Sequence, residues 1–197
     1  MGVSYHRARR GPPSRLEVPL TVSRAAPLLL LVTTLLAACS SGGATFDERG
    51  VSFRYPNGWH RVSDIATAGG ASTHLFSDNV GLDRFNAAIV AINQVTTPVT
   101  AANVSQFAVQ FGTAVERLAR EEGGTVTQRA TSITVNGLPG LQFGISGLRA
   151  AGTPVDSTLT LVFKGTSEYF INCQHTAAHA EEITAGCDQI VKTLKIA

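Results

Sequence analysis

The chain has 197 residues, of which 44% are hydrophobic and 15% charged, a composition that indicates a globular protein and excludes a largely disordered one. The formal net charge of +2 is unevenly distributed, because five arginines and only one acidic residue precede Cys39. The remaining 11 basic and 13 acidic residues give no basic surface of the kind that neutralises phosphates, so we expect no nucleic-acid partner.

The first 38 residues have the order of a secretory signal peptide that is removed from the mature protein: an arginine-rich start, an apolar run over residues 28–38, and then Cys39. These eleven apolar residues would rise about 16 Å as a helix, too little for a hydrocarbon core of about 30 Å. Arg9-Arg10 is an incomplete match to a twin-arginine signal, and a start near Val22 would give a more usual signal peptide. Both alternatives stay open.

Leu36-Ala37-Ala38-Cys39 resembles the bacterial lipobox, and the resemblance implies that the Cys39 thiol receives diacylglyceryl before cleavage frees its amino group. The alternative is an ordinary cleaved signal peptide followed by an unmodified cysteine. Residues 39–45 then comprise the lipidated cysteine and a short Gly/Ser tether, which reaches about 10 to 15 Å as a flexible coil. We expect residues 46–197 to form a single domain held at the extracytoplasmic face of the cell membrane, because acylation of both thiol and amine anchors stably.

The first elements of the mature chain have the patterns of β-strands. Residues 51–55 alternate apolar and polar side chains, Pro56-Asn57-Gly58 is a turn signal, and residues 59–62 resume the strand pattern, so together they predict a β-hairpin. Two further strands are predicted over residues 73–77 and 87–94. The second of these is almost continuously apolar, which predicts a central strand covered on both faces.

Residues 104–122 change to the spacing of an amphipathic helix. Asn103 or Thr100 is the candidate cap at its start, and Gly123-Gly124 ends it. The apolar residues that this spacing places on the buried side are Val104, Phe107, Val109, Phe111, Val115 and Leu118.

Strands return after this helix. Residues 125–135 and 141–148 are predicted to pair around Asn136-Gly137, a dipeptide that supplies the positive φ angles of a tight hairpin. Two more strands, over residues 157–163 and 169–173, are predicted to be joined by residues 164–167.

A final helix is predicted over residues 177–194, and Gly186 is its weak point. Its predicted buried side consists of Ile183, Ile190, Val191 and Leu194. Helices inserted among sequential strands imply an α+β fold in which the helices pack on an antiparallel sheet.

The cysteines predict one disulfide. If Cys39 carries lipid, Cys173 and Cys187 remain as an even pair in an oxidising compartment. Their bond would close a 15-residue segment, which is worth about 3 kcal/mol in the chain-entropy estimate. The alternative is a redox-active dithiol, but such sites favour Cys-x-x-Cys spacing.

Two groups of residues are candidates for a metal or a catalytic site. His175 and His179 have the spacing of two ligands on one helix face, with Glu181 or Glu182 as a third, but nothing supplies a fourth, and two solvated histidines are the favoured interpretation. Ser146, His74 and Asp156 can be assembled into a triad on paper, yet Gly144-Ile-Ser-Gly147 lacks the spacing of a nucleophile elbow. We expect no metal, no cofactor and no enzymatic activity.

Trp59 is the candidate contact with a ligand or partner, since its ring could stack on a ligand. The favoured alternative is that Trp59 packs at one end of the sheet.

Residues 50–59 (Gly-Val-Ser-Phe-Arg-Tyr-Pro-Asn-Gly-Trp) and 135–140 (Val-Asn-Gly-Leu-Pro-Gly) resemble the PsbP/Mog1/DcrB-like superfamily. They are most similar to its envelope lipoproteins in high-GC Gram-positive bacteria, including the LpqN group. The resemblance implies an α/β/α sandwich with a central antiparallel sheet and two main helices. It also implies a non-enzymatic, adaptor-like or ligand-binding role, and it supplies no catalytic residues.

From these observations we expect a membrane-anchored interaction module that docks another protein of the cell envelope. The alternative is a small apolar-ligand or lipid carrier with a pocket between sheet and helix, around Trp59 and the central strand.

Overall fold

The computed structural model describes residues 43–65 and 76–197 of the chain. Within these ranges the chain forms, in order, β1 (Ala44–Glu48), β2 (Val51–Tyr55), β3 (His60–Arg61), β4 (Phe76–Gly81), β5 (Ala87–Val99), α1 (Val104–Glu121), β6 (Thr125–Val135), β7 (Leu138–Ala150), β8 (Thr153–His175), a short 3-10 helix η1 (Ala177–His179), α2 (Ala180–Thr193) and β9 (Lys195–Ile196).

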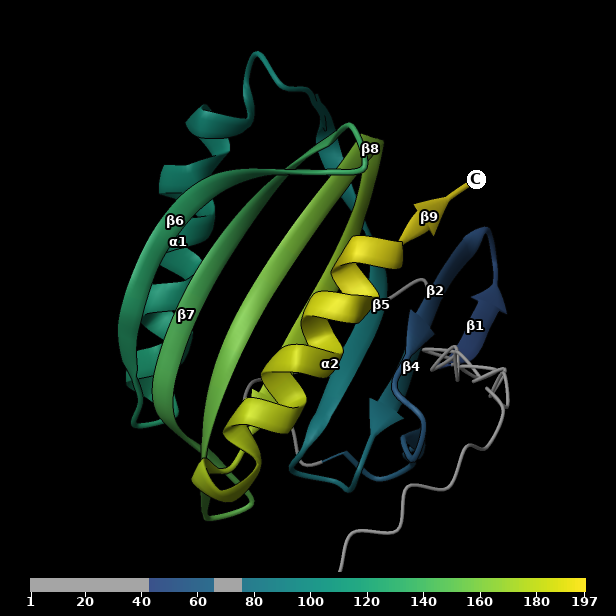
Figure 1. Cartoon of the computed structure of the whole chain (residues 1–197). Helices are drawn as coiled ribbons and strands as arrows, with labels where there is room; N and C mark the ends of the chain where they lie inside the picture. The colour runs from purple at the N-terminus through teal and green to yellow at the C-terminus, as the bar shows by residue number, and fades with distance from the viewer. Residues whose placement is uncertain (1–42, 66–75) are drawn as a thin grey trace, which may run out of the picture. The chain divides into compact units, whose positions relative to one another are not determined.

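An antiparallel sheet in the order β3-β4-β5-β8-β7-β6 forms the centre of the domain (Figure 1). β5 pairs with β4 along one edge and with β8 along the other. Residues 87–92 of β5 are all buried, because both faces of the sheet are covered at this point. The predicted central strand is confirmed.

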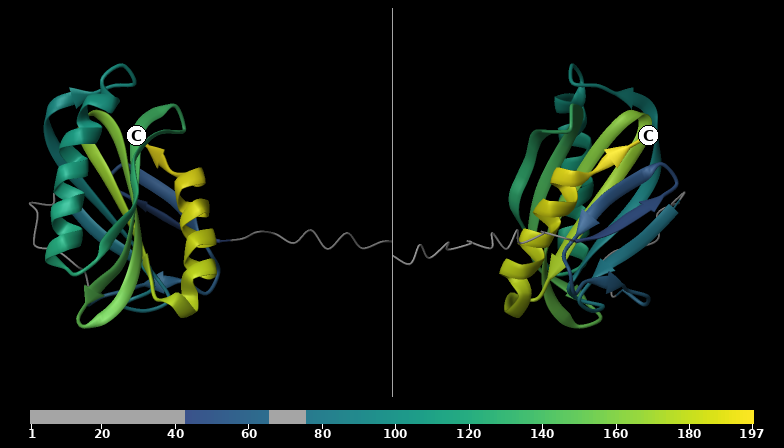
Figure 2. Two further views of the ribbon diagram at one scale, coloured as in Figure 1. Left: turned by 90° about the vertical axis from the view of Figure 1, so that its left-hand side faces the viewer. Right: turned by 45° about the vertical axis from the view of Figure 1, so that its right-hand side comes forward.

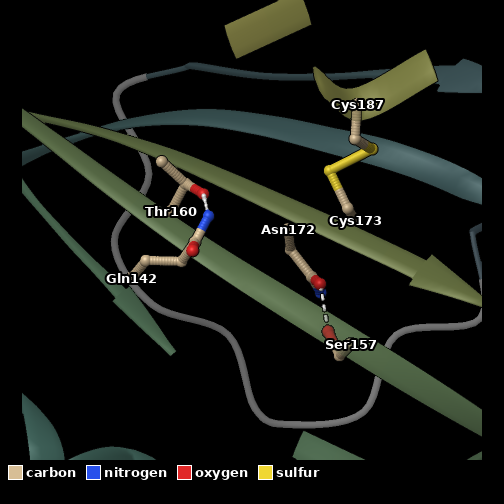
Figure 3. The surroundings of a disulfide bond; sticks show 6 residues. All are labelled: Gln142, Ser157, Thr160, Asn172, Cys173 and Cys187. Atoms are coloured by element: carbon tan, nitrogen blue, oxygen red, sulfur yellow. Dashed lines mark hydrogen bonds between the residues drawn. A yellow bond between two sulfur atoms is a disulfide. The ribbon is translucent and has the colours of Figure 1, made fainter. Parts of the chain in front are cut away.

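The chain reverses direction within β8. Residues 153–162 pair with β7, whereas residues 165–174 pair with β5. The Ser157 hydroxyl donates a hydrogen bond to Oδ1 of Asn172 (Figure 3), although a straight strand would hold these residues about 50 Å apart. The two limbs of β8 therefore lie side by side, as the two strands predicted around residues 164–167 require.

The Asn136-Gly137 turn between β6 and β7 is also confirmed. Both residues have positive φ, 50° at Asn136 and 82° at Gly137, as a tight two-residue hairpin demands.

α1 covers one face of the central sheet, and its buried residues are Val104, Val115 and Ala119. The predicted helix is confirmed, but the prediction that Val109 is buried was wrong, because Val109 is 75% exposed. At about 100° per residue, Val109 lies about 140° around the helix from Val104 and so points away from the sheet. Asn103 is the residue before the helix; its side chain accepts a hydrogen bond from the Thr100 amide instead of capping α1.

α2 and a small three-stranded sheet, β1-β2-β9, cover the opposite face (Figure 2). Side chains of β8 alternate between the two cores: Val162 packs with the α2 side, and Leu161 and Phe163 pack with the α1 side. Ile183 and Ile190 of α2 are fully buried. The expected α/β/α sandwich, an α+β fold with a central antiparallel sheet and two main helices, is confirmed.

The predicted hairpin over residues 51–62 was wrong. β2 pairs with β1 and β9 in the small sheet, whereas β3 pairs with β4 in the central sheet. The turn signal itself was sound, since the Trp59 amide donates to the Pro56 carbonyl, but this turn carries the chain from one sheet to the other. β1 begins at Ala44, and β4 covers the end of the strand predicted over residues 73–77, whose first residues lie outside the described ranges.

Candidate functional site

Cys173 and Cys187 are joined in a disulfide that links the second limb of β8 to α2 (Figure 3). Their Cα atoms are 6.2 Å apart. Both residues belong to the α2-side core and are only 4% and 5% exposed. A disulfide enclosed in this way holds the helix on the sheet, and its burial restricts the access that thiol exchange would need.

Trp59 also lies in the α2-side core and is 5% exposed. Its ring lies directly over Gly186 of α2, with Pro56 at the same contact. The indole Nε1 is buried and has no hydrogen-bond partner among the described residues. This environment matches packing at the end of the sheet, and the space expected for a ligand beside Trp59 is occupied by α2.

The two histidines near α2 have ordinary polar neighbours. Nδ1 of His179 lies 3.4 Å from a carboxylate oxygen of Glu182, and Nδ1 of His175 lies 3.2 Å from the Thr176 carbonyl. Within residues 43–65 and 76–197, no group of three or more His, Cys, Asp or Glu side chains is placed to hold a metal ion.

The residues of the triad drawn on paper have other places in the fold. Asp156 accepts a hydrogen bond of 2.9 Å from the Gly147 amide, next to the irregularity of β7 between Ile145 and Leu148. Ser146 is paired opposite Thr125 of β6. His74 lies outside the described residues. Asp156 therefore stabilises a bulge in the sheet.

Cys39 and the predicted signal peptide likewise lie outside the described residues. In the described part of the chain, no helix combines the length and the apolar character needed to cross a bilayer.

Two neighbouring cavities lie between α1 and the central sheet; together we call them the α1 cleft. The larger, of about 330 Å³, is lined on the helix by Ala108, Val109 and Gly112 and on the sheet by Val126 and Phe143. The smaller, of about 170 Å³, shares Val115 and Phe143 with it and is almost wholly apolar. α1 therefore covers its face of the sheet incompletely.

A larger groove, of about 830 Å³, lies where α2 ends, and we call it the lysine groove. Its apolar surface comes from Phe53, Val135, Leu138, Leu194 and Ile196. Its basic side chains are Arg54, Lys164, Lys192 and Lys195, and no acidic side chain lines it. Lys164, Lys192 and Lys195 are the only lysines in the 197-residue sequence.

Segments far apart in the sequence are hydrogen-bonded to one another around this groove. The side-chain amide of Asn136 donates a 2.5 Å bond to the Leu194 carbonyl at the end of α2. The Arg54 amide donates 2.9 Å to the Thr193 hydroxyl, which joins β2 to the same turn of helix. The Lys164 ammonium donates to main-chain oxygens of Ile196 and Ala197. These bonds fix the shape of the groove.

Two other polar networks join segments that are separate in the sequence. The Arg61 guanidinium bonds to Glu48 of β1 and to Asp78 of β4, and the bond to Glu48 raises the pKa of Arg61 above its ordinary value. Partial burial opposes ionisation of Asp83, but hydrogen bonds from the Asn86 side chain and nearby amides outweigh it and lower the Asp83 pKa.

The fold resembles that of two solved structures. CyanoP, the cyanobacterial PsbP of Synechocystis sp. PCC 6803, aligns with a TM-score of 0.56 and 12% identity over 82% of this chain and 96% of that one. LpqN of Mycobacterium tuberculosis, involved in cell envelope biogenesis, aligns with a TM-score of 0.51 and 13% identity over 81% of this chain and 87% of that one. No protein-family model and no curated protein sequence matches the chain. The domain therefore has a PsbP-like fold, as the sequence resemblance implied.

Sequence reasoning missed both the α1 cleft and the lysine groove. The cleft depends on how far α1 stands from the sheet, which no pattern encodes. The groove carried one visible signal: the chain has only three lysines, and two of them, Lys192 and Lys195, fall within its last six residues.

Proposed function

We propose that this protein is a non-enzymatic module of the bacterial cell envelope, lipid-anchored through Cys39 outside the cytoplasm, which binds a partner protein through the exposed side of α1. The lipobox-like sequence supports the anchor. The shared fold with LpqN, whose structure is described as that of a protein involved in cell envelope biogenesis, supports the location. A fold alone does not specify activity, so the partner-binding role rests on the surface of α1.

Val109 is the observation that carries this role. It is a large hydrophobic side chain left 75% exposed, and it lies at the edge of the larger cavity of the α1 cleft. Glu116 and Arg129 line the same cavity and offer both signs of charge. An exposed apolar side chain beside a pocket that a partner can fill, with polar groups around both, is an arrangement that concentrates binding energy in protein interfaces.

Crosslinking in intact cells followed by affinity capture tests the role. Wild type should capture a specific envelope protein, and Val109→Asp should reduce the recovery at least about tenfold, because a charge at the anchor must be desolvated. Gln110→Asp, at the adjacent exposed position of α1, is the matched control and should capture normally. Equal capture by the two variants, or no specific partner for wild type, would contradict the proposal.

The intact mass of the membrane-extracted protein tests the anchor separately. We expect a chain that starts at Cys39 and carries acyl groups, and that gains about 2 Da when its disulfide is reduced. Cys39→Ala should abolish the acyl mass and release the protein from the membrane. An unacylated mass for wild type would remove the anchor from the proposal.

A second candidate function, carriage of a small apolar ligand, is favoured by the two cavities of the α1 cleft, which share Val115 and Phe143. A ligand there would take the place of the incomplete contact between α1 and the sheet. Native mass spectrometry of the wild-type protein should then show a co-purified apolar molecule. The Ala108→Phe variant, whose added ring fills the cleft, should purify without it. Absence of any such molecule, together with no binding of a fluorescent fatty acid, would contradict this function.

A further inference from the structure

The start of the described chain lies beside the lysine groove. A Cβ placed on Gly43 would lie 2.6 Å from Nε2 of Gln189 on α2 and would contact the Tyr55 carbonyl, so Gly43 sits against the last turns of α2. Thr45, two residues further along the chain, itself lines the groove. Lys192 follows Gln189 by three residues and is therefore its neighbour on the helix surface.

Chain length limits how far the groove can be from Cys39. Four peptide units separate Cys39 from Gly43, and a fully extended chain spans at most about 3.6 Å per residue, or about 14 Å in all. If Cys39 carries the acyl chains, the side of the domain that bears Gly43 is held at the bilayer surface. This step rests on the anchor proposed above.

The lysine groove is positively charged, because its charged side chains are all basic. The chain beyond Cys39 has a net negative charge, with 13 acidic and 11 basic residues. Lys192 and Lys195 are exposed, and neither forms an ion pair within the described ranges. Asp188 lies one turn before Lys192 on α2, and Asp47 of β1 pairs with Ser52, which itself pairs with Lys195. Neither acidic residue lines the groove. Ammonium groups are compact point charges that bind phosphate well.

We propose that the lysine groove is the membrane-contacting surface of this protein and binds the phosphates of anionic phospholipid headgroups. Lys192 and Lys195 contact the headgroups directly, and half-buried Leu138 and Ile196 face the boundary between headgroups and acyl chains. α1 lies on the opposite face of the central sheet (Figure 2), so this orientation leaves Val109 directed away from the bilayer, where a partner can reach it.

The lysines themselves provide the test, because an amine-reactive reagent modifies only the groove lysines once the amino terminus is acylated. The membrane-extracted protein is reconstituted into vesicles of phosphatidylcholine alone, or of equal parts phosphatidylcholine and phosphatidylglycerol. We then follow acetylation of each lysine by mass spectrometry. Lys192 and Lys195 should react about fivefold more slowly on the anionic vesicles, the factor that corresponds to about 1 kcal/mol of headgroup contact per basic residue. High salt should remove the difference.

The matched control is Arg120→Lys, which adds an amine to an exposed position of α1 without changing the charge. The amine introduced by this substitution reports the local reagent concentration and should react equally on both kinds of vesicle. Equal rates for Lys192 and Lys195 on both vesicles would overturn the proposal. Protection seen on native membranes but absent on anionic vesicles would also overturn it, and would indicate an acidic protein as the occupant.

Failure of the anchor and failure of the groove give different results. If the intact mass shows no acyl group, the same protein is simply mixed with the two kinds of vesicle. Slower acetylation on anionic vesicles then supports headgroup binding without an anchor. An acylated protein whose lysines react equally on both vesicles keeps the anchor and rejects the groove.

Discussion

The indole ring of Trp59 occupies the space that a side chain at Gly186 would need. A Cβ at Gly186 would lie 2.5 Å from Cη2 of Trp59 and closer still to Cζ2, and real Cβ contacts of this kind do not occur. The glycine that interrupts the helical pattern of α2 therefore lies in close contact with the core residue Trp59. Glycine lowers helix propensity, but at this position its missing side chain permits tight packing.

Gly186→Ala should lower the free energy of unfolding by up to about 2 kcal/mol, measured by urea denaturation. Overpacking costs about 1 to 3 kcal/mol and exceeds the gain of about 1 kcal/mol from replacing a helical glycine. Gly112→Ala in α1 is the matched control: a Cβ there meets nothing within 4 Å, so this variant should be more stable than wild type. In a Trp59→Leu background the cost of Gly186→Ala should disappear; a cost that persists would show that the ring is not its cause.

Removing the disulfide should destabilise the domain by about 3 kcal/mol, since the Cys173–Cys187 bond closes a 15-residue segment. The Cys173→Ser/Cys187→Ser variant, compared with oxidised wild type in the same denaturant series, gives this value. Wild type unfolded in reductant should approach the variant. Equal stability of the variant and oxidised wild type would mean that the bond does not constrain the unfolded chain.

Substitutions at Asn136 should separate its role in the β6–β7 turn from its hydrogen bond to the Leu194 carbonyl. Asn136→Gly keeps the turn but loses the hydrogen bond to the Leu194 carbonyl, which should cost about 1 kcal/mol. Asn136→Ala loses the same hydrogen bond and also places at φ of 50° a residue without the polar side chain that lets asparagine adopt this conformation. It should therefore cost about 1 kcal/mol more. Thermal unfolding ranks the three proteins. The interpretation fails if Ala is tolerated better than Gly.

The lowered pKa of Asp83 predicts a pH-dependent contribution to stability. Because the ionised carboxylate is favoured in the folded state, its contribution is complete above the unfolded pKa of about 3.9 and is lost as the pH falls through the lower folded value. The stability difference between wild type and Asp83→Ala should therefore be larger at neutral pH than in acid. Asn86 links Asp83 to Thr176: its side-chain amide donates to the Asp83 carboxylate, and its Oδ1 accepts hydrogen bonds from the amide and hydroxyl of Thr176. A difference that does not change with pH would exclude this origin.

Local patterns in the sequence predicted the elements well where a single segment carries the whole signal. The continuous apolar run of β5 and the Asn136-Gly137 turn need no information from elsewhere in the chain. The helix over α1 was also correct, but Val109 shows the limit of counting apolar residues. A residue about 140° from Val104 cannot share its face, and the angle could have been calculated from the sequence.

Which strands pair with each other was not predictable from the sequence. The segment before Pro56 and the segment after Gly58 both have strand patterns, and the turn between them is real, yet they belong to different sheets. β9 has two residues, too few for any periodicity to detect. The lysine groove depends on both of these features, because β2 and β9 form part of its wall. Its lysines were visible in the sequence, but their convergence was not.

The pairing of β2 with β9 sets a condition on when the small sheet can be completed. Val51 and Ser52 are paired with Ile196 and Lys195, and the amide of Ala197 donates to the Gly50 carbonyl. β2 must therefore wait for a segment about 145 positions later in the chain, and until that segment arrives β2 has one unpaired edge. The small sheet can therefore close only when the segments at both ends of the domain are present together, and the domain remains incompletely folded until they meet.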